Sequence, residues 1–143
     1  MENPYRIIAD QVKNRLYIDL YLTEEEQAEN IEDEIFQKAK QLTVEWGCIV
    51  NYTKIDVPLT QNLLDKAEAV MSFFRPLGMG QLVRVLTEDQ SSLNEELKNR
   101  SMKIGGYEGI VAQSIQDANT ILDCIPNYLS CRISRELFSN YQS

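Results

Sequence analysis

Two short apolar runs with one amphipathic segment between them constrain the fold of this chain more than any other feature. The first run covers residues 48–52, and a proline-marked loop leads from it into the amphipathic segment; the second run covers residues 82–86. Such runs on either side of a helical pattern predict a strand, helix, strand unit, whose strands are parallel and whose connection is almost always right-handed. We therefore expect a sheet covered by helices.

The size and charge of the chain limit its class. With 143 residues, 43% of them hydrophobic and 25% charged, it is long enough for one globular domain with a substantial core. A net charge of −8 disfavours nucleic acid or an anionic membrane as partner. The apolar runs are only a few residues long, and the first residues lack a basic and apolar leader, so we expect no membrane span and no signal peptide.

Cysteine and histidine usage narrows the chemistry. The three cysteines, Cys48, Cys124 and Cys131, are odd in number and lack a Cys-x-x-Cys spacing, which argues against a disulfide framework and a thiolate zinc site. We expect a reducing, cytoplasmic location and no metal or cofactor. Cys48 lies in a predicted buried strand, where it is interpreted as a small hydrophobic residue. The chain has no histidine, which excludes Ser-His and Cys-His catalysis.

The N-terminal part predicts a hairpin followed by a helix. Residues 5–10 and 15–22 flank a short turn, and the second run alternates apolar and polar residues, as expected for an antiparallel pair with one packed face. Thr23 and Glu26 have the spacing of a capping box, and apolar residues then recur every three or four positions, which predicts a helix over about 24–43.

The central part predicts the strand, helix, strand unit in more detail. A buried strand is expected over 47–53, and Thr60 is a natural N-cap for the helix that follows. That helix carries a broad apolar stripe and is expected to stop before Pro76 and Gly78. The stripe consists of Leu63, Leu64, Ala67, Val70, Met71 and Phe74. A face this wide is expected to pack on a sheet.

Two further helices and a last strand complete the pattern. Ser92 and Glu95 have capping-box spacing ahead of a helix that ends at Gly105, residues 107–112 are expected to form the last strand, and Ser114 opens a fourth helix. The order β-β-α-β-α-β-α-β-α predicts an α/β fold with one mixed five-stranded sheet, parallel apart from its leading hairpin strand.

The last twenty residues are expected to stand apart from this pattern. Residues 1–123 are assigned to the α/β domain, and residues 124–143 to an added C-terminal helix. Apolar residues recur there at roughly helical spacing: Tyr128, Leu129, Ile133, Leu137, Phe138 and Tyr141. This helix is expected to pack either on the domain itself or on a second subunit, which would make the chain a homodimer.

The element order and several local strings resemble the STAS domains, the fold of sulphate transporters and anti-sigma-factor antagonists, and most closely their SpoIIAA-like relatives. The resemblance covers roughly residues 5–123. The strings that carry it are residues 13–18, 46–51, 82–85, 106–108, 114–118 and 121–122. None of these strings carries chemistry, so the resemblance implies a fold more directly than a function.

The resemblance also implies a regulatory role. In anti-sigma-factor antagonists of this fold, a serine or threonine at the start of the helix after the third strand is phosphorylated by a partner kinase. The corresponding region here is Asp56 to Thr60, although the Asp-Ser-Ser-Gly-like string is missing and no serine follows Asp56. The resemblance thus implies a non-enzymatic module that binds an unidentified protein partner, with Asp56 and Thr60 as the candidate phospho-switch. As a plain N-cap, Thr60 would contribute about 1 kcal/mol to stability.

Two alternative functions remain open. A small hydrophobic ligand or lipid carrier would use Met71, Phe73, Phe74 and Met79 to line a cavity, whereas the same side chains would otherwise form core. An enzyme would have Asp56 at the carboxyl end of a strand, where α/β sheets place ligands, but no partner carboxylate stands at a diagnostic spacing. Arg84, inside a predicted strand, is interpreted as an outward-facing residue.

Overall fold

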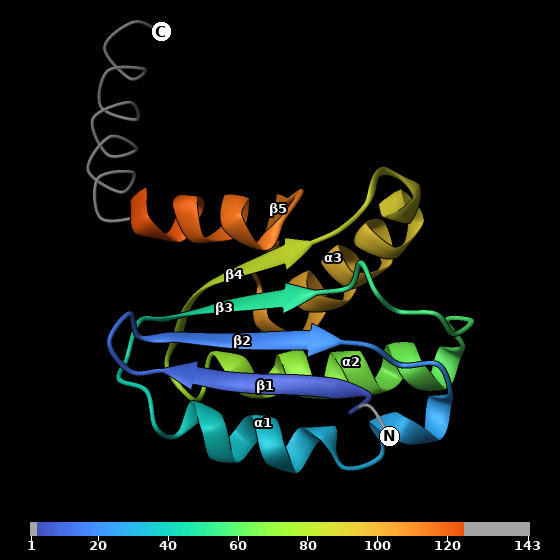
Figure 1. Ribbon diagram of the computed structural model, residues 1–143, viewed down its shortest axis with the longest axis horizontal. Coiled ribbons are helices and arrows are strands. Elements are labelled where there is room, and N and C mark those ends of the chain that lie inside the picture. Colours follow the sequence, from blue (N-terminus) through green and yellow to red (C-terminus); the bar gives the residue numbers. More distant parts are fainter. Residues whose placement is uncertain (1–2, 125–143) are drawn as a thin grey trace, which may run out of the picture.

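The computed structural model describes residues 3–124 and shows an α/β fold built on one mixed five-stranded sheet (Figure 1). The strands are β1 (Tyr5–Asp10), β2 (Arg15–Leu20), β3 (Trp46–Asn51), β4 (Met79–Val85) and β5 (Ile110–Ala112). They lie in the order of the sequence, with β1 antiparallel to β2 and every other pair parallel. The mixed five-stranded α/β sheet expected from the sequence is therefore confirmed. The last strand is shorter than the expected 107–112.

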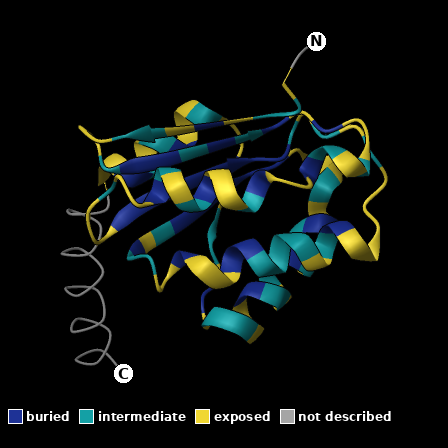
Figure 2. Ribbon diagram, turned by 90° about the horizontal axis from the view of Figure 1, so that it is seen from below, coloured by how far each residue is buried: buried dark blue, intermediate teal, exposed yellow. Residues whose placement is uncertain are grey.

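The helices divide unequally between the two faces of the sheet. The crossover helices are α1 (Ile31–Ala39), α2 (Gln61–Phe74) and α3 (Ser91–Gly105). Each new parallel strand is added on the same side of the previous one, so right-handed connections place all three helices on one face. A helical segment over 115–124 covers part of the other face. Exposed residues lie on the outward side of the helices, whereas the strands between the layers are largely buried (Figure 2).

Two hydrophobic cores result from this arrangement. The larger one lies between the sheet and α1 to α3, and its most deeply buried members include Leu16, Trp46, Phe74, Leu82 and Leu97. The smaller one lies between the sheet and the segment 115–124. It consists of Ile49, Val83, Val85, Ala112, Ala118 and Leu122. Strands β3 and β4 contribute to both cores, which explains why the two apolar runs of the sequence are nearly continuous.

The helix starts differ from the sequence-based expectation. The single helix expected over 24–43 is two pieces, a 3-10 helix η1 (Glu25–Ala28) and then α1. The side-chain oxygen of Gln27 accepts hydrogen bonds from the backbone N–H groups of Thr23 and Glu24, at 2.8 and 3.1 Å. Gln27 therefore fills the role expected of Glu26, and this capping closes a short 3-10 turn rather than starting a long helix.

The second capping box, expected at Ser92 and Glu95, is also wrong, because the cap lies several residues earlier in the chain. The structure has a 3-10 helix η2 (Glu88–Gln90) and starts α3 at Ser91, so Ser92 lies inside the helix instead of before it. The side-chain oxygen of Gln90 accepts from the backbone N–H of Thr87 at 2.9 Å. In both places a glutamine side chain performs the capping. The glutamates of the two expected capping boxes, Glu26 and Glu95, do not.

The expected C-terminal helix over 124–143 lies, apart from Cys124, outside the described residues. The surface through which a homodimer was expected to form therefore also lies outside the described residues. Within residues 3–124, no helix is both long enough and apolar enough to cross a membrane.

Candidate functional site

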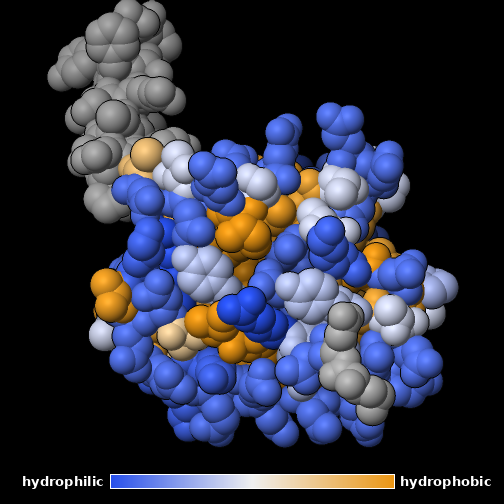
Figure 3. Space-filling view, viewed as in Figure 1, coloured by the Kyte–Doolittle hydropathy of each residue, from blue (hydrophilic) through white to orange (hydrophobic). Residues whose placement is uncertain are grey.

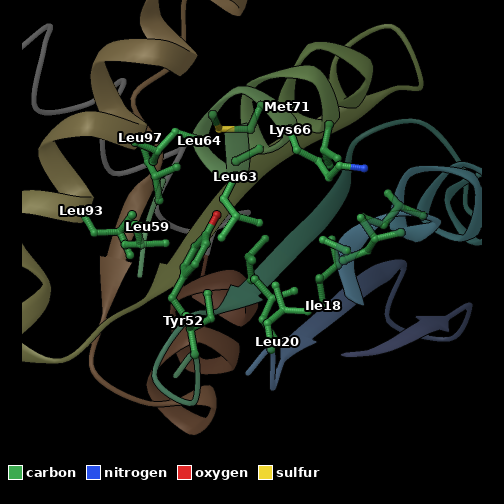
Figure 4. A pocket seen from close by; sticks show the side chains of 18 of the residues that line it. Ile18, Leu20, Tyr52, Leu59, Leu63, Leu64, Lys66, Met71, Leu93 and Leu97 are labelled. Atoms are coloured by element: carbon green, nitrogen blue, oxygen red, sulfur yellow. The ribbon is translucent and has the colours of Figure 1, made fainter. Parts of the chain in front are cut away.

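An apolar cavity of about 90 Å³ lies between the sheet and α1, α2 and α3. Its walls come from the inner side chains of β2 and β3, from all three helices, and from the loop over residues 52–60 (Figure 4). The lining residues include Ile18, Leu20, Val50, Tyr52, Leu63, Met71, Phe74 and Leu97. The cavity is therefore a hollow in the larger core, close to the carboxyl end of β3.

Hydrogen bonds to the backbone hold the 52–60 loop over this cavity. The backbone N–H of Asp56 donates to the carbonyl of Leu22 at 2.9 Å, and the side-chain amide of Gln90 donates to the carbonyl of Tyr52 at the same distance. Ile55, Val57 and Leu59 of this loop turn apolar side chains to the cavity. The loop is thus anchored at its start and middle to the neighbouring ends of β2 and η2.

Tyr52 is the residue that brings a polar atom into the cavity. Among the described lining residues, only Tyr52 and Lys66 have hydrogen-bonding side chains. The Lys66 ammonium is turned away toward the Glu29 carbonyl, at 3.2 Å, whereas the Tyr52 hydroxyl points toward the centre (Figure 4). Burial raises the pKa of Tyr52 to about 12, and the positive charge of Arg84 opposes that rise. The phenol is therefore protonated at neutral pH.

Arg84 is only 1% exposed and lies behind the cavity wall: it does not line the cavity itself, but its guanidinium contacts Met71 and Leu97, which do. Its Nη1 donates to the Glu108 carbonyl at 2.5 Å, and its Nη2 lies 3.0 Å from the Ser101 hydroxyl oxygen, 3.4 Å from the Leu97 carbonyl and 3.6 Å from the Met71 sulfur. Its Nε has no hydrogen-bond partner among the described residues. The interpretation of Arg84 as outward-facing is wrong, because Arg84 shares the inner face of β4 with Leu82.

Every described partner of the Arg84 guanidinium is electrically neutral. The groups around it are two carbonyls, a hydroxyl and a thioether. Burying a cation without a counter-ion carries a large desolvation cost, which neutral hydrogen bonds offset only in part. Two more groups near Arg84, Cys48 and Tyr107, have their pKa values raised by burial, with Arg84 opposing the shift. Both stay protonated, so neither supplies the missing negative charge.

Gly109 permits the position of Arg84. A Cβ atom at residue 109 would lie 2.7 Å from Nη1 of Arg84, and the backbone there has φ +81°, a conformation that favours glycine. No motif in the sequence marks Gly109 or Tyr52 as a site residue. Residue 84 alternates in phase with Leu82 and Leu86, which belong to the larger core, but Val83 and Val85 belong to the smaller core, so the alternation does not identify the face of Arg84.

The four residues expected to line an apolar ligand site separate in space. Met71 and Phe74 line the cavity. Phe73 instead lies on the outer side of α2, where its ring packs edge-on against Phe36 with the centroids 6.5 Å apart. Met79 is buried at the start of β4 and does not line this cavity.

The structure places Thr60 and Asp56 on the 52–60 loop, both exposed. Thr60 is the N-cap of α2, as expected, and its hydroxyl oxygen accepts from the backbone N–H of Leu63 at 3.3 Å. The same hydroxyl donates to a carboxylate oxygen of Glu25 in η1. A single exposed side chain therefore connects the start of α2 with η1.

Two other surface regions have features of a binding site. Ile8 of β1 and Tyr21, directly after β2, are exposed on the face opposite the crossover helices. The space-filling view shows hydrophobic areas between hydrophilic neighbours on this side of the molecule (Figure 3). A polar groove lies between β1 and the η1–α1 region and is lined by Arg6, Glu26 and Glu34 with their neighbours. Within residues 3–124, no group of three or more metal-ligating side chains is close enough to hold a metal ion. The cavity with Arg84 is the feature with the most defined chemistry.

No protein-family model matches this chain, and neither the curated proteins nor the solved structures contain a match.

Proposed function

We propose that this chain is a non-enzymatic regulatory module of the STAS type that binds a protein partner in the cytoplasm. Its binding surface would be the carboxyl end of the parallel strands, formed by the 52–60 loop, the start of α2 and η1. The resemblance of the sequence to SpoIIAA-like domains supports this proposal, and so does a five-stranded sheet whose β1 alone is antiparallel.

The observation that carries the proposal is the hydrogen bond between Thr60 and Glu25. A phosphate on Thr60 would add nearly two negative charges beside the Glu25 carboxylate, and the two groups would repel each other. The N-terminus of α2 offers free N–H groups and a partial positive charge, so the phosphate would turn toward α2. Phosphorylation would therefore separate η1 from α2 and change the shape of the binding surface.

Hydrogen exchange tests this switch without knowledge of the partner. In Thr60→Glu, we expect faster exchange of the η1 amides, because two carboxylates then face each other. In Thr60→Glu combined with Glu25→Gln, exchange should return toward the wild-type rate. Unchanged η1 exchange in Thr60→Glu would show that this contact is no switch.

Site-specific photo-crosslinking tests the binding surface. A photoreactive amino acid at Leu59, which is 41% exposed, should form a discrete adduct with a partner in cells, and Thr60→Glu should change the yield of that adduct. The matched control is Val12, which is 97% exposed in the turn between β1 and β2 at the opposite end of the sheet. Equal adduct patterns at Leu59 and Val12 would contradict the proposed surface.

A second candidate function is the binding of a small hydrophobic ligand. The observation that favours it is the apolar cavity beneath the 52–60 loop. The two candidates are compatible in space, because Leu59 lines the cavity and directly precedes Thr60 in the sequence. A ligand in the cavity would support the loop from below while a partner binds it from outside.

A further inference from the structure

We infer that the cavity binds a small amphipathic carboxylate, with the apolar body among β2, β3, α1 and α2 and the carboxylate directed at Tyr52 and Arg84. This inference rests on the ligand-binding function proposed above as the second candidate, and it names the chemistry of the ligand.

The first argument is the charge of Arg84. Its guanidinium is buried, its described partners are all neutral, and its Nε lacks a partner among the residues that the structure describes. A carboxylate is the group that best matches a guanidinium, because its two oxygens accept charge-assisted hydrogen bonds from the planar N–H groups. A ligand that brings such a group would supply the counter-ion that the described part of the chain does not.

The second argument is that Arg84 and the cavity share walls. Met71 and Leu97 contact the guanidinium and also line the cavity. Tyr52 lines the cavity and feels the charge of Arg84 strongly enough for its pKa to respond. A carboxylate at the Tyr52 hydroxyl would therefore lie within the field of Arg84, and it could accept a hydrogen bond from the phenol, which is protonated at neutral pH.

The third argument is the size and polarity of the cavity. A cavity of about 150 Å³ accepts a benzene ring, so about 90 Å³ suits a body of about four carbon atoms. Apart from Tyr52 and Lys66, the lining residues described are apolar, which excludes a sugar or a nucleotide base as the buried part. A longer chain would extend toward Leu59, which is partly exposed at the loop.

The test compares an acid with its alcohol on the full-length protein. Methyl-resolved NMR would follow titrations with butanoate, hexanoate and octanoate, and with 1-hexanol as the neutral probe. We expect shifts at the methyl groups of Ile18, Leu63 and Leu97, and roughly tenfold tighter binding of hexanoate than of 1-hexanol, as charge-assisted hydrogen bonds predict.

Variants assign this preference to the two residues. Arg84→Met keeps a long apolar stem and should abolish the preference for hexanoate over 1-hexanol. Tyr52→Phe should weaken hexanoate binding several-fold, and it carries the test if Arg84→Met does not fold. The matched control is Tyr17→Phe, which removes a hydroxyl on the opposite face of the sheet and should leave binding unchanged.

The outcomes separate this inference from the function on which it rests. Equal binding of hexanoate and 1-hexanol would keep the ligand site and overturn the recognition of a carboxylate. Binding of neither molecule at the lining methyl groups would overturn both. A preference for hexanoate that survives unchanged in Tyr52→Phe and in Arg84→Met would place the carboxylate elsewhere and overturn the assignment.

Discussion

Two arginines lie buried on opposite faces of the sheet, and they are treated differently. Arg15 in β2 has a side chain 7% exposed, and its guanidinium pairs with the Asp123 carboxylate at 2.5 Å and with the Asn119 side-chain oxygen at 2.7 Å. Arg84 in β4 is more deeply buried, at 1% exposed, and pairs with neutral groups alone among the described residues. The chain therefore provides a counter-ion for one buried cation, and its described part leaves the other without one.

The difference indicates two different roles. Arg15 attaches the segment 115–124 to the outer face of the sheet, and its carboxylate partner is half exposed to water. Its charge is paired, so we assign it a structural role. Arg84 is held in place by α3 and by the backbone of Glu108, beside a cavity that is almost entirely apolar. A positioned charge without a counter-ion is the arrangement that a binding site for an anion requires.

The largest expected effect is on stability when either arginine is removed. Arg84→Ala should lower the free energy of unfolding by about 3 kcal/mol, because the cavity in the core and the unpaired buried acceptors outweigh the desolvation cost that is relieved when the cation is removed. Arg15→Ala should lower it by less than half as much, since Asp123 and Asn119 can be hydrated at the surface. Urea denaturation of both variants measures the difference. Equal losses would remove the distinction between the two sites.

A pair of glycine variants isolates the close approach at Arg84. Gly106→Ala and Gly109→Ala both force a side chain into positive φ, at +69° and +81°, which costs about 1 kcal/mol each. Only Gly109→Ala also places a Cβ against Arg84, so it should cost about 1 to 2 kcal/mol more. Thermal unfolding of the two variants gives this difference directly. If both variants unfold alike, Arg84 moves without cost.

Removing one tyrosine hydroxyl from each face of the sheet should have a smaller effect on stability, and the two losses should differ in a predictable direction. The Tyr17 hydroxyl donates to the Asn119 side chain at 2.6 Å beside Arg15, so Tyr17→Phe should cost about 1 kcal/mol. The Tyr52 hydroxyl lines an otherwise apolar cavity, and its polar neighbour is the Arg84 guanidinium rather than a close acceptor, so Tyr52→Phe should cost less than Tyr17→Phe. Urea denaturation should therefore rank the two variants in this order, and the reverse order would contradict the proposed environment of Tyr52.

The smallest expected effect is a change in how stability falls at acid pH when the Asp123 carboxylate is removed. The Arg15 hydrogen bond holds the pKa of Asp123 below its ordinary value of 3.8. Because the folded pKa is lowered, this pair stabilises the fold fully above that value, and its contribution disappears as the pH falls through the folded pKa. Asp123→Asn should therefore reduce the loss of stability between neutral pH and acid, as measured by melting temperature. A steeper acid loss in this variant would contradict the pairing.

The amino-acid sequence predicted the layers of this fold better than it predicted the site. Period-two and helical patterns are properties of whole segments, so the sheet and its helices could be expected from the order of residues alone. The capping frames differ from the expectation because Gln27, rather than Glu26, accepts from the Thr23 N–H, and because Gln90 caps an earlier turn at Thr87, ahead of Ser92 and Glu95; spacing alone cannot rank these alternatives. Thr60 was found because an N-cap is a local feature.

The buried charge could not be found in this way. Arg84 follows the alternation of β4, but both faces of β4 are covered, so the alternation does not distinguish inward from outward for a polar residue. Its position depends on Ser101, Glu108 and Gly109, which belong to later segments that only the tertiary fold brings to β4. The sequence likewise predicts that Tyr52 belongs to a strand, but it does not predict that Tyr52 lies near Arg84.

The strict sequential order of the strands has a consequence for how the protein reaches its native state. Each strand from β2 onward pairs with the strand that precedes it in the chain, so the sheet can grow during synthesis from the N-terminal hairpin without rearranging earlier pairs. The wall made by Leu93 and Leu97 arrives late, with α3. Arg84 is therefore expected to remain hydrated on an incomplete sheet and to leave water only at one of the last docking steps, when Ser101 reaches it.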